Sequence, residues 1–131
     1  MSISVRERNA EFGFFGGCLM DIIKLAAEAA NDKKARDLVA LDISAIASFA
    51  DQFLICTGDS SRQIQAISDE IEMRLKASGV RPYQIEGRQN AEWVVMDYSD
   101  LVVHIFSKTA RAYYDLERLW RDAVQIELKL E

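Results

Sequence analysis

Residues 57–61, Thr-Gly-Asp-Ser-Ser, form the segment of the chain best suited to bind an anion or a nucleotide. They lie between an apolar run typical of a central strand and a run with helical spacing, so backbone amides and a helix dipole meet there. The spacing of a P-loop and the three glycines of a dinucleotide-binding motif are missing. We interpret the segment as a turn followed by a helix N-cap. The alternative is a nucleotide-binding or nucleotidyl-transferring enzyme that uses Gly58–Ser61.

A nucleotidyltransferase also needs paired carboxylates that hold two metal ions for phosphoryl transfer. The next predicted strand offers only Glu86. Asp97 and Asp100 are three residues apart across a predicted turn, whereas neighbours on one face of a strand are two apart. These two aspartates are therefore expected either to cap the turn as solvated charges or to bind a partner. The sequence predicts no catalytic residue, no metal site and no cofactor.

His104 is the only histidine and lies in an apolar strand run. A general base needs a positioned partner, and the sequence shows none, so we expect a buried histidine that bonds a backbone group. Cys18 and Cys56 are 38 residues apart, which is not a metal-ligand spacing. Cys56 is expected to be a small core residue.

The elements that position these residues follow from apolar spacing and turn residues. In chain order the sequence predicts a helix over 21–30, strands over 37–43 and 52–57, a helix from Ser60 to about Gly79, strands over 83–87, 93–98 and 101–106, and a helix over 109–124. Ser60 and Gln63 form a capping box, and Ser99-Asp100 is the tight turn of an antiparallel hairpin. Residues 124–131 alternate and fit either an edge strand or an extension of the helix. This order predicts an α/β or α+β fold, a mixed sheet flanked by helices.

The last predicted helix carries a stripe of side chains with the spacing of a buried face. These side chains are Tyr113, Leu116, Leu119, Trp120 and Ala123. Aromatic and charged residues are also dense in this part of the chain: Trp93, Tyr98, Arg111, Tyr113, Tyr114, Glu117, Arg118 and Trp120. Such residues anchor protein interfaces, although both tryptophans fit a core position equally well.

Composition and charge limit the class of protein. The chain has 131 residues, 50% of them hydrophobic and 28% charged, which predicts one folded domain. Its net charge of −5 argues against binding bare nucleic acid by counterion release and suggests neutral or basic partners. No apolar run approaches the ~20 residues of a membrane span. Two cysteines without a pairing pattern fit a reduced, cytoplasmic setting.

We expect three segments along the chain. Residues 1–19 are a flexible leader, a mis-start upstream of Met20 or a cloning remnant, and residues 20–124 are the single domain. Residues 125–131 are a C-terminal tail.

Eight blocks in a fixed order resemble the ribosomal silencing factors, also called the Iojap family. They are Asp32–Asp37, Leu41-Asp42, Ala50–Phe53, Gly58–Gln63, Glu86-Gly87, Glu92–Tyr98, Asp100–Phe106 and Tyr114–Trp120. The resemblance runs from about Asp32 to Ala123. One departure is Tyr98-Ser99, where the family often has a glycine in the turn.

The resemblance implies a nucleotidyltransferase-like fold that has lost catalysis and needs no cofactor. It implies binding to the large ribosomal subunit through its ribosomal protein L-fourteen, which blocks joining of the small subunit, and it permits a homodimer in the free protein. Carried onto this sequence, it implies a partner-binding face, or its support, formed by Trp93, Asp97, Tyr98, Asp100, His104, Arg111, Tyr114, Glu117 and Trp120.

Overall fold

The computed structural model describes residues 19–130, so the expectations for the leader before Leu19 fall outside the described residues. The elements are α2 (Leu19–Asp32), β1 (Arg36–Asp42), β2 (Gln52–Gly58), α3 (Ser61–Ala77), β3 (Gln84–Glu86), β4 (Trp93–Asp97), β5 (Leu101–Ser107), α4 (Lys108–Tyr114), α5 (Leu116–Leu119) and β6 (Val124–Ile126). None of the helices in this part of the chain is long and apolar enough to cross a membrane.

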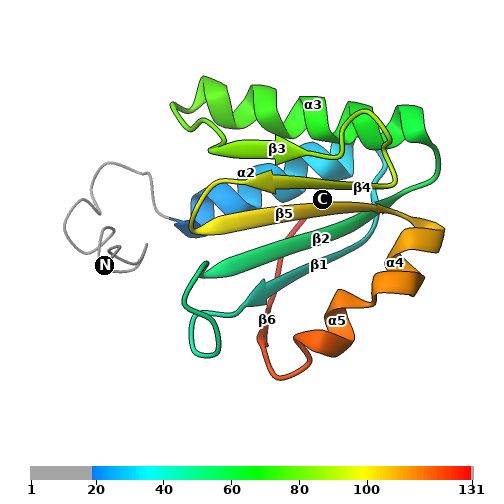
Figure 1. The fold of residues 1–131 in the computed structure, drawn as a ribbon. Coiled ribbons are helices and arrows are strands. Elements are labelled where there is room, and N and C mark those ends of the chain that lie inside the picture. Colours follow the sequence, from blue (N-terminus) through cyan, green and yellow to red (C-terminus); the bar gives the residue numbers. More distant parts are fainter. Residues whose placement is uncertain (1–18, 131) are drawn as a thin grey trace.

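The strands form one mixed sheet in the order β3-β4-β5-β2-β1-β6 (Figure 1). β2 and β5 pair in parallel at its centre, and the other neighbouring strands pair antiparallel. Every residue of β2 is buried, as expected for a strand covered on both faces. The predicted α/β fold with a mixed sheet and flanking helices is therefore confirmed.

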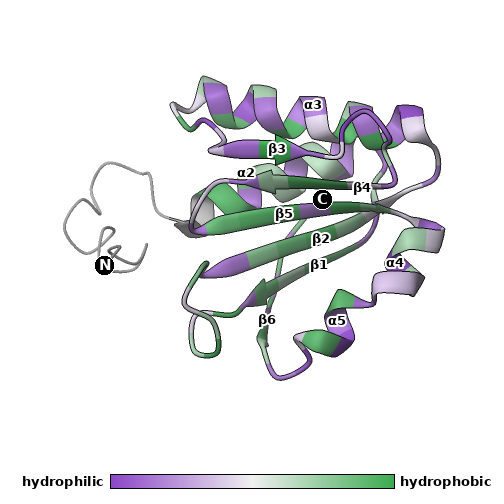
Figure 2. Cartoon of the chain, viewed as in Figure 1, coloured by the Kyte–Doolittle hydropathy of each residue, from purple (hydrophilic) through white to green (hydrophobic). Residues whose placement is uncertain are grey.

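The helices divide between the two faces of the sheet. In Figure 1, α2 and α3 lie behind and above the sheet, whereas α4 and α5 descend from its right-hand end. The core beneath α2 and α3 includes Ile23, Leu54, Ile64 and Ile105. A smaller core on the opposite face includes Phe53, Ile55 and Phe106, with Leu116 and Trp120 packed on it. Figure 2 shows the result as central strands that are hydrophobic over most of their length, a mostly hydrophilic edge strand β3 and an α3 that alternates between hydrophobic and hydrophilic residues.

Helix α3 begins at the predicted N-cap and ends near the predicted glycine, although the Gln63 side chain accepts from the Asp59 amide and not from the Ser60 amide of a capping box. The N-cap Ser60 accepts a hydrogen bond at its Oγ from the Gln63 amide, at 3.1 Å. The predicted stripe Ile64, Ile67, Ile71 and Leu75 is fully buried. The chain leaves the helix at Gly79, where φ is +85°.

The single helix predicted over 109–124 is wrong. Asp115 has φ 47°, which is a left-handed conformation, and its amide donates to the Arg111 carbonyl; this ends α4 and turns the chain into the short α5. The stripe is therefore split. Leu116 and Trp120 pack on the sheet, whereas Tyr113 and Leu119 are 80% and 71% exposed, against the expected burial.

The structure decides between the two interpretations of the C-terminal tail, an edge strand or an extension of the preceding helix. Val124–Ile126 form β6, which pairs antiparallel with β1 at the sheet edge, Ile126 opposite Ala40. The edge-strand interpretation is therefore confirmed for these three residues, and the helical extension is wrong. Leu128 and Leu130 continue onto the core beneath α2.

Candidate protein-binding face

Seven rings form a continuous layer on the sheet face opposite α2 and α3. We call this layer the aromatic face. Its members are Phe49, Phe53, Trp93, His104, Phe106, Tyr114 and Trp120.

Strand register explains why these residues meet. Trp93 on β4 lies opposite Phe106 on β5, and Asp97 lies opposite Val102, which in turn lies opposite Phe53 on the parallel neighbour β2. Because side chains alternate along a strand, Trp93 and Asp97 point to the same side of β4. The register therefore places an indole, an imidazole and phenyl rings in one layer.

The ring contacts link the two tryptophans. The Trp93 indole lies 5.1 Å from the Phe106 ring and 4.5 Å from the Tyr114 ring, centroid to centroid. Trp120 packs edge-on against Phe53 at 5.5 Å. Both tryptophans are half-buried, so each lies between the core position and the interface position that the sequence left open.

His104 is one of the buried members of this layer and is only 6% exposed. Its Nδ1 accepts a hydrogen bond from the Trp93 Nε1–H at 3.1 Å, so the partner is a side chain and not the backbone group that the sequence suggested. Its Nε2 has no hydrogen-bond partner. Burial away from water lowers the pKa of His104 to about 4, so the ring is neutral at physiological pH.

Arg111 and Glu117 support the face from its end. The Arg111 guanidinium donates to the Glu117 carboxylate at 2.8 Å, to the Asp37 carbonyl at 2.7 Å and to the Thr57 hydroxyl at 2.9 Å. Its side chain is 13% exposed, so this ion pair lies partly out of water. Arg111 therefore ties α4 and α5 to the ends of β1 and β2.

Tyr98 lies on the opposite side of the sheet from the aromatic face, and Asp100 contributes no ring to that face. Tyr98 packs against the core beneath α2 and α3, with its hydroxyl buried and without a partner, and burial raises its pKa above the usual range. Asp100 lies in the β4–β5 turn and its carbonyl accepts from the amides of Asp51 and Gln52. The structure therefore gathers Trp93, His104, Tyr114 and Trp120 in one layer and places Tyr98 on the other side of the sheet.

Carboxylates border the face on the β3 side. Glu86 lies opposite Val95 and Gln84 opposite Asp97, so the Glu86 and Asp97 side chains share the side of the sheet on which Trp93 lies. Asp97 also caps the turn, since its Oδ1 accepts from the Ser99 amide at 2.7 Å. Ser99 has φ 75°, so the turn adopts a conformation that favours glycine although it has none.

The groups at the corner near Gly58 are engaged within the chain. The Gln63 side chain accepts from the Asp59 amide and donates to the carbonyls of Lys33 and Lys34, and Asp59 pairs with Arg36 at 3.0 Å. A Cβ at Gly58 would lie 2.6 Å from the Ile64 side chain, so this glycine serves the close packing of strand and helix. Among residues 19–130 no three His, Cys, Asp or Glu side chains are grouped to hold a metal ion. The geometry does not favour the enzyme alternative.

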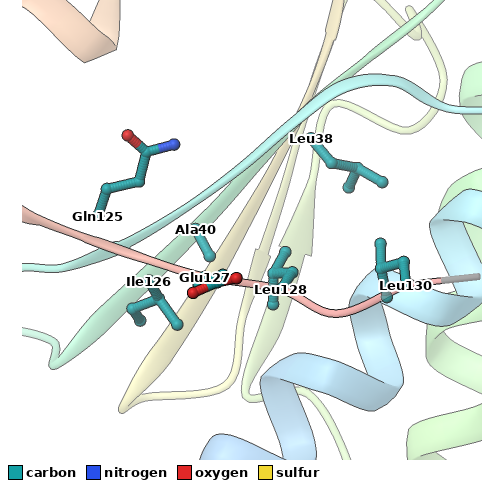
Figure 3. Close-up of a pocket in the computed structure, with 7 residues that line it drawn as sticks. All are labelled: Leu38, Ala40, Gln125, Ile126, Glu127, Leu128 and Leu130. Atoms are coloured by element: carbon teal, nitrogen blue, oxygen red, sulfur yellow. The ribbon is translucent and has the colours of Figure 1, made fainter.

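A groove of about 510 Å³ lies on the other side of the molecule. Figure 3 shows it between β1 and the C-terminal tail, with Leu38, Ile126, Leu128 and Leu130 among the lining side chains. These side chains pack on the core beneath α2, so the groove is separate from the aromatic face.

Sequence reasoning missed two members of the face, Phe49 and Phe53. Phe49 is 60% exposed in the loop after β1, and a phenylalanine among Ala and Ser was the available signal. Phe53 is buried in a strand that is apolar on both parities, so only the tertiary register assigns it to this face.

Comparisons with known proteins agree with this arrangement. Residues 19–131 match the family model described as "Ribosomal silencing factor during starvation". The chain is 47% identical over 107 residues to a protein of Bacillus subtilis named ribosomal silencing factor, a match that covers 82% of this chain and 91% of that one. A protein of the same name from Halalkalibacterium halodurans is 45% identical over 109 residues, which cover 83% of this chain and 93% of the relative. A crystal structure of a Chromobacterium violaceum protein superposes with a TM-score of 0.77 at 40% identity, covering 79% of this chain and 86% of that one.

Proposed function

Because the chain belongs to the ribosomal silencing factor family, we propose that it binds the large ribosomal subunit and sterically blocks joining of the small subunit. In this proposal the contact is with ribosomal protein L-fourteen, and the chain acts in the cytoplasm of a bacterium. Silencing occurs by occlusion, without a catalytic step. The relatives are named as silencing factors rather than as enzymes, which supports this view.

The observation that carries the proposal is the aromatic face. Its two tryptophans and Tyr114 keep exposed surface on a side of the sheet that α2 and α3 do not cover. Tryptophan and tyrosine are the residues most enriched among those that dominate binding energy. A half-buried ring is also held by the chain before binding, so little side-chain entropy is lost when a partner docks.

Charge supports a basic protein as the contact. The chain carries a net charge of −5, and Asp97 and Glu86 lie on the same side of the sheet as Trp93. Carboxylates at the rim of an interface select a basic partner and speed encounter more than they add affinity. The aromatic face supplies the affinity in this scheme, and the acidic border supplies orientation.

Sedimentation with isolated large subunits tests the proposal directly. We expect the chain to co-sediment with large subunits and to reduce the joined-ribosome peak when small subunits are added at permissive magnesium. Trp93→Ala should weaken large-subunit binding by about thirtyfold, because a central tryptophan contributes ~2 kcal/mol.

Met73→Ala is the matched control. Met73 is 59% exposed on α3, on the other side of the sheet, so its truncation removes an exposed apolar side chain without touching the aromatic face. Binding by Trp93→Ala as tight as that of the unmodified chain would show that the aromatic face is not the docking surface. Absence of binding at physiological salt would contradict the function itself.

A further inference from the structure

We propose that His104 is a positioning residue of the aromatic face: it accepts the Trp93 indole N–H and thereby fixes which edge of the indole a partner meets. This inference rests on the proposed function, since it concerns the same docking surface. His104 does not itself touch the partner, because it is only 6% exposed.

Packing alone does not determine the indole's orientation. Trp93 stacks on Phe106 with an interplanar angle of 24° and leans on Tyr114 at 40°. Such ring contacts restrain the plane of an indole, but they do not engage its N–H group. The indole has a single donor, Nε1–H, and its bond to His104 Nδ1 at 3.1 Å fixes which edge of the indole faces His104.

The acceptor is itself held firmly. The His104 ring lies nearly parallel to Phe106, at 9° and 6.1 Å, and edge-on to Phe53, at 72° and 4.7 Å. Its strand position is fixed between Val95 on β4 and Ile55 on β2. Because the indole can only donate, Nδ1 must be unprotonated, and the imidazole proton of the neutral ring lies on Nε2.

A purely structural role gives a poor account of this histidine. Its Nε2 is buried without a partner, and burying an unsatisfied polar group costs free energy that a phenyl ring would not. An apolar ring at position 104 would fill the same layer between Phe53 and Phe106. What only the histidine supplies at this position is the acceptor for Trp93, and that acceptor acts on the exposed ring of the docking surface.

A double-mutant cycle on large-subunit affinity tests the assignment. His104→Phe keeps a flat ring and removes the acceptor, and Trp93→Phe keeps a ring and removes the donor. We expect His104→Phe to weaken binding about tenfold in the unmodified chain, yet to have no further effect in the Trp93→Phe background. His104→Asn, whose amide oxygen can replace Nδ1 as acceptor, should recover most of the lost affinity. Equal losses in both backgrounds, or no loss in the first, would overturn the proposal.

A control on the same strand separates positioning from general destabilisation. Ile105 is fully buried on the opposite face of β5, so Ile105→Val lowers stability without contact to Trp93. An affinity loss in Ile105→Val as large as that in His104→Phe would also overturn the assignment.

The free protein gives a readout that does not depend on ribosomes. The Trp93 indole N–H should exchange slowly with solvent in the unmodified chain and markedly faster in His104→Phe, as followed by nuclear magnetic resonance. Equal exchange rates would refute the positioning role. Slow exchange in an unmodified chain that does not bind large subunits would instead refute the proposed function and leave the hydrogen bond established.

Discussion

The buried imidazole of His104 makes the aromatic face sensitive to acid. The ring neighbours of His104 are Phe53, Trp93 and Phe106, none of which carries a negative charge that would stabilise an imidazolium. Protonation would also place a second N–H on Nδ1, directly facing the Trp93 N–H. Burial away from water lowers the pKa of His104 from 6.5 to about 4, and the arrangement of the two N–H groups likewise disfavours the imidazolium.

Stability should therefore fall in a defined pH interval. The unfolded chain takes up the proton near pH 6.5 and the folded chain only near pH 4. The contribution of neutral His104 to the free energy of unfolding is therefore fully present above pH 6.5 and is lost progressively as the pH falls to 4. Over the whole interval the loss is about 3 kcal/mol, at 1.36 kcal/mol per pKa unit.

Urea unfolding at pH 7, 5.5 and 4 measures this loss. Carboxylates titrate in the lower part of the same range, so the comparison is with His104→Phe, which retains them and lacks the imidazole. From pH 7 to pH 4 the free energy of unfolding should fall more steeply in the unmodified chain than in His104→Phe. Parallel curves would show that His104 is not the titrating group.

At the scale of elements, Arg111 links helices α4 and α5 to the sheet. It lies in the last turn of α4 and bonds to α5 through Glu117, to the start of β1 through the Asp37 carbonyl, and to the end of β2 through Thr57. Asp37 and Asp115 both have left-handed backbones, with φ of 52° and 47°. The guanidinium thus holds together segments whose own conformations are unfavourable.

Arg111→Ala should destabilise the fold by about 2–3 kcal/mol, because it leaves three acceptors without their donor. Arg111→Lys should recover only a small part, since one ammonium cannot reproduce the planar fork of donors. Thermal unfolding of the two variants gives the measurement. A lysine variant as stable as the unmodified chain would show that a single positive charge suffices.

The elements with local signals were predictable, and those set by tertiary contacts were not. The Ser60 cap and the hairpin at Ser99-Asp100 were found because their determinants lie within a few residues. No glycine or proline near Asp115 predicts that the helix ends there. The conformation depends on Arg111, which is bound to β1 and β2. Phe53 and His104 are 51 residues apart and meet only through the parallel register of β2 and β5.

The candidate site was predictable to a similar extent. The aromatic density late in the chain and the family resemblance led to Trp93, Tyr114 and Trp120, which the structure brings into one layer with His104. The same aromatic density and family resemblance grouped Tyr98 with them, but it packs on the opposite face of the sheet. Whether a residue faces one side or the other changes with each step along a strand, so block similarity alone does not assign it.

At the scale of the whole molecule, we expect the two faces of the sheet to have different roles, one in stability and the other in partner binding. The core beneath α2 and α3 is the larger one and includes the tail residues Leu128 and Leu130 among its packed neighbours. The opposite core is smaller, and the half-buried Trp93 and Trp120 pack against it. Stability and partner binding should therefore be separable by mutation.

Leu128→Ala tests this separation. Leu128 lines the groove of Figure 3 and packs on the α2 side, so its truncation should cost about 1–2 kcal/mol of stability for a half-buried leucine. The affinity for large subunits should remain unchanged at a temperature where the variant is folded. A matched loss of affinity, measured by the same sedimentation assay, would show that the two faces are coupled.

The position of β6 has a consequence for how the chain acquires its structure during synthesis. β1 leaves the ribosome well before its outer neighbour β6, and seven other described elements lie between them in the chain: β2, α3, β3, β4, β5, α4 and α5. Contacts between such distant parts of a chain form slowly, because a large loop must close first. A nascent chain therefore leaves the outer edge of β1 uncovered until residues 124–126 have been synthesised, and only then can β6 pair with it.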